Sequence, residues 1–400
     1  MKNYNMKKQA GFTLVEFIVA MGVTLVVLGG ATLAFKDTVS TNQHVTMHED
    51  MNENMRAGMN LMQQDFILAG SGIPTGGIVI PATSDNKPTA CNIGQPINRP
   101  GPDPTGASVP STSIFFNYQN TCSFSLPAIE PGADLGPLVT SPDSTPATAS
   151  DMITVLYADN TLPLSAKFIN TPAIPTTDPP TPACNGTISA SGDSVTFDTN
   201  CVDLSKAGIV YAPGDLILFN NSSPIGYALQ AVTKVQGQTL SFAAGDPYHL
   251  NQRTDPSGTI QQIQNTNCIP NADGTSTCTP NGTYPATTAT RVWMITYYLD
   301  NQTDPVHVRL VRRVNFRPGQ PVGETLENLQ FAYNYIDGTT TPPTGQSGVP
   351  TGYSENQIRS ANVFVAARST YPDPSTNKYL RDSLTTQVSF RSMAFVNKYK

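Results

Sequence analysis

Residues 7–35 read KKQAGFTLVEFIVAMGVTLVVLGGATLAF, a basic start followed by an apolar run from Phe12 to Phe35. As a helix rising about 1.5 Å per residue, this run is about 36 Å long, enough to cross a hydrocarbon core of about 30 Å. No small-residue cleavage site of the A-x-A type follows it, which argues against a secretory signal peptide that is removed. Because lysines precede the run, we expect a cytoplasmic N-terminus and export of everything that follows the run.

Glu16 is the one charged residue in this run. A carboxylate at depth in a membrane costs roughly 2.5 to 3.5 kcal/mol, and less near the interface. Its position leaves two interpretations open: the side chain lies close enough to the headgroups to reach water, or it has a partner. The neighbouring residues favour a partner.

The stretch GFTLVE, residues 11–16, resembles the processing site of class III signal peptides, found in type IV pilins and in the pseudopilins of type II secretion. The resemblance implies that a prepilin peptidase cuts between Gly11 and Phe12, that Phe12 is N-methylated and that the apolar helix is kept. It also implies that Glu16 neutralises the α-ammonium group of a neighbouring subunit's Phe12 on assembly. The expected partners are this peptidase, other minor and major pilins along the N-terminal helix, and the inner membrane.

Beyond Phe35 the helix is predicted to continue to about Ala69 as an amphipathic extension. We expect its C-terminal half to dock on the chain's own β-domain, and Phe12–Phe35 to serve assembly. The predicted segments are a leader (1–11), a transmembrane helix (12–35), the amphipathic extension (36–69) and an exported β-rich head (70–400). The apolar stripe of the extension comprises Val39, Met47, Met51, Met55, Met59, Met62 and Phe66.

The rest of the chain contains short apolar segments separated by turn residues, which predicts strands. The fold class is therefore α+β, with a long N-terminal helix packed on a large antiparallel sheet. DNQTDP, residues 300–305, is predicted to connect a hairpin. The expected strands are Gly77–Ile80, Ser113–Tyr118, Met152–Ala158, Ser194–Asp198, Asp215–Asn220, Tyr227–Val235, Thr239–Ala243, Val292–Leu299, Val306–Val314, Leu329–Tyr335, Ala361–Ala367 and Ser383–Val396.

Three stretches rich in Pro, Thr and Ser are predicted to be long surface loops or linkers: Gly136–Ser150, Thr171–Ala183 and Gly338–Gly352. The chain has a net charge of −6 and no extended basic surface, so nucleic acid is not an expected partner. Its short cluster of arginines is interpreted as solvating a strand and the following turn. These residues are Arg309, Arg312, Arg313 and Arg317.

Six cysteines lie on the exported side, which predicts disulfides, although fifteen pairings are possible. Zinc is the alternative, but the sequence has no C-x-x-C. Sequence proximity suggests the pairs Cys91–Cys122, Cys184–Cys201 and Cys268–Cys278.

No metal site or cofactor is predicted. His44 and His48 lie one helical turn apart, but no third ligand is evident and a solvated polar face is expected. Two loops, 271–274 and 300–304, contain oxygen ligands that could hold calcium, although Asn, Asp and Gly are also what turns require. The chain has four histidines and no G-x-S-x-G, H-E-x-x-H or phosphate-binding loop, so no enzymatic activity is expected.

A wider resemblance suggests a subfamily. Several strings occur in the order expected of PilW-like minor pilins, whose relatives in type II secretion are J-type pseudopilins. The resemblance implies a non-enzymatic minor pilin that is anchored in the inner membrane with a periplasmic head, helps to prime filament assembly and reaches the cell surface at or near the pilus tip. The alternatives are a J-like pseudopilin and an adhesin-like binding head on a pilin stalk. The strings are Asp151–Ala158, Pro213–Asn220, Trp293–Asp300, Leu310–Arg313, Glu327–Asp337 and Gln387–Val396.

Overall fold

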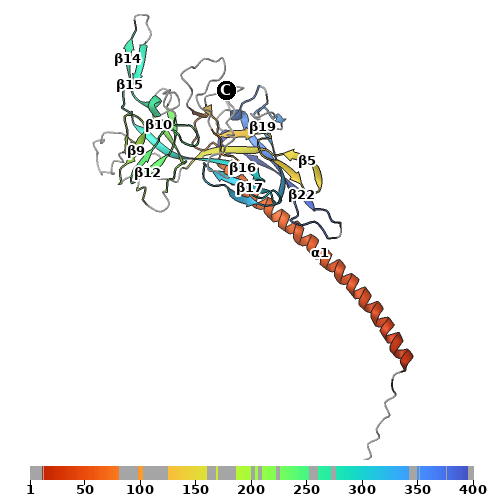
Figure 1. Ribbon diagram of the computed structural model, residues 1–400. Coiled ribbons are helices and arrows are strands. Elements are labelled where there is room, and N and C mark those ends of the chain that lie inside the picture. The colour runs from red at the N-terminus through yellow and green to blue at the C-terminus, as the bar shows by residue number, and fades with distance from the viewer. Residues whose placement is uncertain are drawn as a thin grey trace, which may run out of the picture.

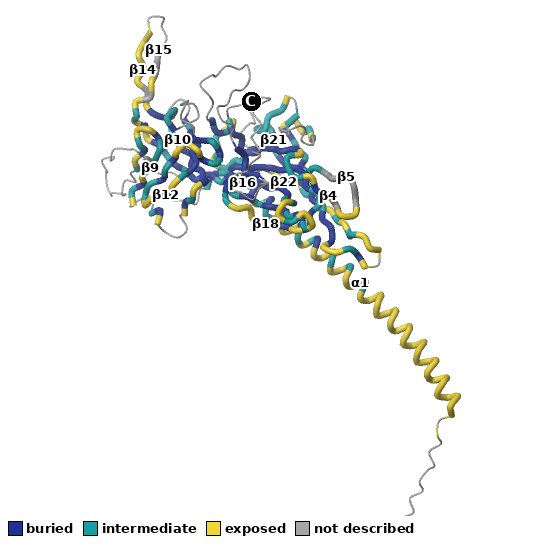
Figure 2. The backbone as a smooth tube through the Cα atoms, in the orientation of Figure 1, coloured by how far each residue is buried: buried dark blue, intermediate teal, exposed yellow. Residues whose placement is uncertain are grey.

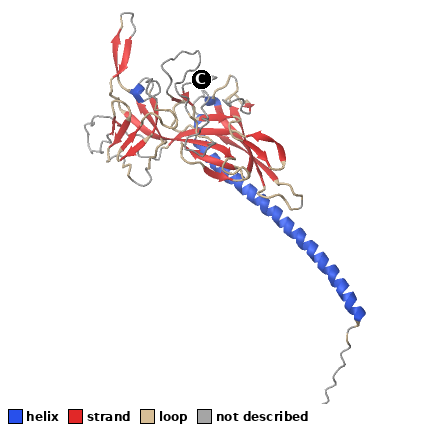
Figure 3. Ribbon diagram, in the orientation of Figure 1, coloured by secondary structure: helices blue, strands red, loops and turns tan. Residues whose placement is uncertain are grey.

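A computed structural model shows one long helix carrying a β-rich head (Figures 1 and 3). Helix α1 (Leu14–Leu68) has 55 residues, and its C-terminal part enters the head while its N-terminal part extends away from it. The predicted α+β layout is therefore confirmed. The structure describes residues 11, 13–80, 98–101, 125–159, 168–169, 186–199, 203–205, 210–221, 226–251, 260–271, 276–341, 349–350, 352–374 and 376–394.

The C-terminal part of α1 is an element of the hydrophobic core. The predicted stripe is buried from Met51 to Phe66, whereas Val39, at its other end, is 40% exposed (Figure 2). Docking on the chain's own head is thus confirmed for this part of the helix. The helix ends at Leu68, one residue before the predicted end, because Gly70 and Gly72 adopt positive φ values of 81° and 70° that terminate it.

The lobe that receives α1 contains a four-stranded antiparallel sheet with the order β20-β19-β21-β22. Phe66 is at the centre of its core, with ring centroids 6.2 Å from Tyr297, 6.3 Å from Phe331 and 5.5 Å from Phe390. These contacts bury the helix end among strands that are distant in sequence. The strands are β19 (Leu326–Tyr335), β20 (Thr340–Thr341), β21 (Ile358–Arg368) and β22 (Arg381–Ser389).

One strand joins this lobe to a second, distal lobe. Strand β16 (Thr287–Asp300) pairs along one edge with β10 through residues 287–292 and with β17 through residues 295–300. Its other edge pairs with β7 and β6. The two lobes therefore share a continuous backbone element. Its sheet includes β3 (Ile129–Gly132), β6 (Met152–Ala158), β7 (Phe168–Ile169), β10 (Leu216–Asn221), β11 (Tyr227–Ala231), β17 (Arg309–Val314) and β18 (Gln320–Gly323).

The distal lobe packs a second four-stranded sheet, β12-β13-β9-β8, beside the N-terminal half of β16. Phe219 and Phe242 meet at its core, with ring centroids 5.7 Å apart. A hairpin, β14 (Thr266–Pro270) and β15 (Ser276–Pro280), projects from this lobe far from α1 (Figure 1). The strands of the second sheet are β8 (Gly186–Ile188), β9 (Ser194–Phe197), β12 (Lys234–Gln236) and β13 (Thr239–Ser241).

The smaller elements complete the described fold. They are β1 (Ile78–Val79), β2 (Ser125–Leu126), β4 (Leu138–Ser141), β5 (Ser144–Ala149), the 3-10 turns η1 (Ile260–Ile263) and η2 (Glu355–Gln357), and α2 (Arg391–Ala394).

Most predicted strands are present, and the hairpin joined by DNQTDP is confirmed by the antiparallel pairing of β16 and β17. Two expectations are wrong. Gly136–Ser150 is not an irregular loop, since its backbone forms the β4–β5 hairpin, at whose base the Gly136 N–H donates a hydrogen bond of 2.9 Å to the Ser150 carbonyl. The last strand ends at Ser389, where the chain turns into α2, instead of running to Val396. Ser113–Tyr118 and Thr171–Ala183 lie outside the described residues.

Asp151 connects three parts of the lobe that receives α1. Its carboxylate accepts hydrogen bonds from the backbone N–H groups of Asp134 (3.0 Å) and Phe331 (2.9 Å), and its own N–H donates to Leu329 (2.9 Å). Burial raises the pKa of this carboxyl to about 6, although the two N–H donors oppose the shift. The folded state therefore holds the Asp151 proton at pH values where the unfolded chain has lost it.

This shift predicts a pH-dependent stability difference. Because the folded pKa exceeds the unfolded value, Asp151 should cost stability progressively as pH rises from about 4 to about 6, by about 3 kcal/mol in total. The measurement is the free energy of unfolding of the wild type minus that of Asp151→Asn, obtained by denaturant titration at each pH. We expect the difference to fall across this window and to be flat above pH 7. A difference in the free energy of unfolding that rises with pH would contradict the raised pKa of Asp151.

Candidate functional site

The first turn of α1 is closed by the residues of the GFTLVE stretch. Thr13 is the N-cap, and its hydroxyl accepts a hydrogen bond of 3.3 Å from the Glu16 N–H. Oε2 of Glu16 accepts in return from the Thr13 N–H at 3.0 Å and from the Thr13 hydroxyl at 2.9 Å. This reciprocal capping box gives Glu16 a role within its own chain that the sequence interpretation missed. Gly11 is exposed beside it, and Phe12 lies outside the described residues.

In the part of the chain that the structure describes, the following apolar part of α1 is exposed. The side chains of Leu14 and Phe35 are 77% and 70% exposed, and the most apolar stretch of the helix has no buried residue. The hydroxyls of Thr24 and Thr32 donate to the carbonyls four residues earlier, at 2.7 and 2.6 Å, so they present no free donor outward. By length and composition this helix can cross a membrane.

Residues 6–32 match the family model of the prokaryotic N-terminal methylation motif. The match includes Gly11, Phe12 and Glu16 and supports a prepilin-type signal, and hence a type IV pilin-like or pseudopilin protein. It implies processing by a prepilin peptidase and pilin-type assembly in general, and proteins with this motif are generally structural. No curated protein and no solved structure matches the chain.

The docked end of α1 is fixed by a buried carboxylate. Asp65 is 3% exposed and accepts hydrogen bonds from the hydroxyls of Tyr297 (2.6 Å) and Tyr157 (3.1 Å). The Arg312 guanidinium forms two bonds to the same carboxylate, from Nε at 2.7 Å and from a terminal nitrogen at 3.0 Å. These three partners belong to the adjacent strands β6, β16 and β17. One helix side chain therefore ties α1 to three strands at once.

Asp65, Arg312 and the two tyrosine hydroxyls at this junction depend on one another for hydrogen-bond partners. Burial, together with the Asp65 charge, raises the pKa of the Tyr157 and Tyr297 phenols above their ordinary value, so both remain hydrogen-bond donors. Removing Asp65 would leave the half-buried Arg312 cation and two phenols without this acceptor. Removing one partner of a buried ion pair lowers stability by more than the intact pair contributes, because the remaining charge stays buried without a partner.

Asp65→Ala is accordingly expected to lower the free energy of unfolding by about 3 to 5 kcal/mol. The measurement is denaturant unfolding of the full chain, followed by the fluorescence of Trp293. The matched control is Glu53→Ala, an exposed carboxylate on the same helix, with an expected change within about 0.5 kcal/mol. Equal effects of the two variants would show that the Asp65 network does not hold the helix.

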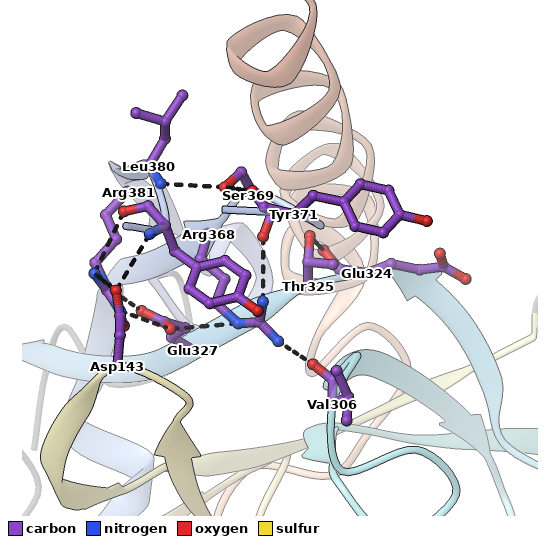
Figure 4. Close-up of polar contacts among 11 residues, drawn as sticks. Asp143, Val306, Glu324, Thr325, Glu327, Arg368, Ser369, Tyr371, Leu380 and Arg381 are labelled. Atoms are coloured by element: carbon purple, nitrogen blue, oxygen red, sulfur yellow. Dashed lines mark hydrogen bonds and ion pairs between the residues drawn. The ribbon is translucent and has the colours of Figure 1, made fainter. Parts of the chain in front are cut away.

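A second polar cluster lies where α1 leaves the head (Figure 4). Arg381 of β22 pairs with Asp143 at the tip of the β4–β5 hairpin and with Glu327 at 2.8 Å. Arg368 lies 3.5 Å from the same Glu327 and donates to the Val306 carbonyl. These contacts hold the β21–β22 connection, the hairpin tip and β19 together at the exit of the helix.

The β21–β22 connection also contacts α1 directly. Nε2 of His44 lies 3.0 Å from a carboxylate oxygen of Asp373, which is 1% exposed. Tyr371 and Thr325 approach the next turn and, with Met47 and other residues, enclose a cavity of about 90 Å³. The expected solvated face is confirmed for His48, which is exposed, whereas a segment distant in sequence partly covers His44, whose side chain is 34% exposed.

In the loop 300–304, whose oxygen atoms could hold calcium, the carboxylates accept hydrogen bonds from nearby backbone N–H groups. The Asp300 carboxylate accepts from the N–H groups of Gln302 and Thr303, and Asp304 accepts from those of Val306 and His307. These are turn contacts. Most of the 271–274 loop lies outside the described residues, among which no group of three or more His, Cys, Asp or Glu is placed to hold a metal.

Of the cysteines, Cys268 is disulfide-bonded and stands directly opposite Cys278 in the β14–β15 register. This register is compatible with the predicted pair Cys268–Cys278. The other four, Cys91, Cys122, Cys184 and Cys201, lie outside the described residues, so their pairing stays a prediction.

The interpretation of the arginine cluster as a solvated surface is wrong. Arg312 binds Asp65, and Arg313 is 4% exposed, with its guanidinium donating to the carbonyls of Gly101 (2.8 Å) and Arg317 (3.0 Å). Arg317 binds the buried Asp215, which Arg291 also contacts. Arg312 and Arg313 are consecutive in β17, so their side chains point to opposite faces of the sheet, and each meets a buried acceptor.

Sequence reasoning did not find Asp65, Asp143 or Glu327. A signal existed only for Asp65, the one acidic residue adjacent to the apolar stripe at Phe66 near the helix end. Asp143 and Glu327 stand in ordinary turn and strand contexts, and only the tertiary structure brings them to Arg381.

Proposed function

We propose that this protein is a minor pilin, a low-abundance, non-enzymatic subunit that is cut after Gly11, N-methylated at Phe12 and held in the inner membrane by residues 12–35. From there it helps to prime a type IV pilus and sits at or near its tip. The observation that carries the proposal is the uncovered apolar part of α1, which follows the methylation motif and continues into a large head. A head of more than 300 residues is awkward to repeat along a thin filament but has room at a tip.

The capping box is compatible with a contact between subunits through Glu16. Both of its capping hydrogen bonds use Oε2, which leaves Oε1 for a second donor. The α-ammonium group of a neighbouring subunit's Phe12 would supply that donor and cancel two charges that are each costly in lipid.

A J-like pseudopilin of type II secretion is the main alternative, since it would use the same N-terminal segment. An adhesin-like head is favoured by one feature, the disulfide-containing β14–β15 hairpin, which projects from the lobe farthest from α1 (Figure 1). Recovery of the chain from sheared pili, or only from secretion-system membranes, separates pilin from pseudopilin.

The first test is the intact mass and N-terminal peptide of the chain purified from its native membrane or from sheared filaments. We expect a chain that begins at N-methylated Phe12. Gly11→Asp should retain residues 1–11, since the peptidase accepts only a small residue at this position, whereas Gly11→Ala should be processed. A wild-type chain that begins at Met1, or beyond Phe35, would overturn the proposal.

Glu16 variants separate its two roles. Glu16→Gln can preserve the capping box, because Gln also serves at this position, but it has no charge to pair with an ammonium group. If pairing drives assembly, Glu16→Gln and Glu16→Ala should both lower incorporation into filaments by at least about tenfold while processing continues. The readout is the ratio of filament to membrane protein on immunoblots. Normal incorporation of Glu16→Gln would assign Glu16 to capping alone.

A further inference from the structure

Strand β22 forms an exposed edge of the sheet that receives α1. It is the last strand in the order β20-β19-β21-β22 and pairs with β21 through nine consecutive residues without a register shift. Its sequence, RDSLTTQVS, contains no Pro or Lys, and the ladder contains no bulge. Natural edge strands usually contain a Pro, a Lys or a bulge, or are short, because these features prevent an open strand edge from pairing with a strand of another chain.

The backbone groups that face outward can be assigned from the hydrogen bonds at both ends of the ladder. Ser369 donates to the carbonyl of Leu380, and Phe390 donates to that of Arg359, so even-numbered residues bond to the β21 side. The N–H of Ser383, an odd-numbered residue, binds the Asp382 side chain instead. In the described part of the chain, the outward N–H and C=O groups of Thr385, Gln387 and Ser389 have no backbone partner.

The edge runs beside an uncovered flank of α1. Asn52 and Gln63 contact the side chains of Asp382 and Thr386, at 3.4 and 3.2 Å, and so hold the helix along β22. A groove of about 890 Å³ follows the flank of α1 from Asn60 to Thr41, and Asn52 is among its lining residues. The Arg381 cluster occupies the start of the strand, whereas residues 383–389 remain open.

We propose that this edge binds an extended strand from the head of another subunit with the same type of N-terminal helix. Main-chain donors and acceptors in a straight row are complementary to a β-strand. The groove and the uncovered apolar part lie on the same helix, so a neighbour packed along α1 would bring its head to β22. The inference rests on the proposed function, because it requires subunits assembled side by side.

A second copy of this chain joined through its own β22 does not satisfy the geometry. Two identical edges joined antiparallel are related by a two-fold axis perpendicular to the sheet. Such an axis reverses α1, and two opposed helices cannot enter one membrane from the same side. The geometry therefore excludes a symmetric β22–β22 contact, whereas a strand from a different subunit requires no such axis.

The test places a photo-crosslinking amino acid at Gln387 in the full chain, in cells that contain the native assembly. Thr385→Pro removes one outward N–H and no bond to β21, whereas Thr385→Ala keeps that N–H and is the matched control. Ser389→Pro and Ser389→Ala repeat the comparison at the end of the strand, in case Thr385→Pro lowers the thermal stability of the head. Crosslinked partners are identified by peptide mass spectrometry, and the processing of Phe12 is measured in the same samples.

We expect a crosslink to another subunit with an N-terminal methylation motif, lowered at least tenfold by proline and unchanged by alanine. A crosslink to a second copy, one insensitive to proline at both positions, or none at all from a chain with methylated Phe12, would overturn this inference and leave the proposed function standing. An unprocessed chain would overturn both.

Discussion

The contact between Asp65 and Arg312 is the interaction on which the arrangement of this molecule depends. A helix of 55 residues has no intrinsic reason to leave a β-rich head in one direction. The Asp65 carboxylate supplies one, because its partners lie on β6, β16 and β17, three neighbouring strands of one sheet. Apolar burial of Phe66 and the methionines stabilises the contact without fixing its orientation, whereas directional hydrogen bonds to a buried charge fix both position and rotation.

Strand β16 connects the hydrogen bonds at Asp65 to the distal lobe. Tyr297, near one end of the strand, binds Asp65, and Arg291, near the other end, binds Asp215 at the boundary with β10. Arg317 pairs with the same Asp215, and Trp293 has both guanidinium groups near its ring, at 4.2 and 5.5 Å. Buried ion pairs add little net stability, but leaving either partner alone is costly, so they disfavour other arrangements of the two lobes.

The two ends of α1 differ in how their polar groups find hydrogen-bond partners. At the head, the helix packs against the strands and forms hydrogen bonds to them. It also contacts the connection between β21 and β22, through His44 and Asp373. At the other end, the hydroxyls of Thr24 and Thr32 donate to preceding carbonyls, and the box of Thr13 and Glu16 satisfies the N–H groups of both residues within the helix. This self-sufficiency is what a lipid environment demands of a single helix. It also explains why a carboxylate is tolerated at the start of an apolar run.

The sequence by itself determined the long helix, its apolar first part, the end of the helix near Gly70 and most of the strands. Each of these depends on residues close together in the chain: an uninterrupted apolar run, a methionine every third or fourth position, and glycines that terminate a helix. The motif around Gly11 and Glu16 is local in the same sense. Only the tertiary structure decided the partners of Asp65, the burial of Arg312 and Arg313, the contact of His44 and the hairpin within Gly136–Ser150. The partners of these side chains are distant in sequence, as Asp65 and Arg312 are, and side-chain chemistry does not reveal which strands will be neighbours. Backbone pairing uses N–H and C=O groups that all residues except proline supply, so a Thr-rich stretch with few prolines can form a hairpin and a polar strand such as β22 can end a sheet with its edge open.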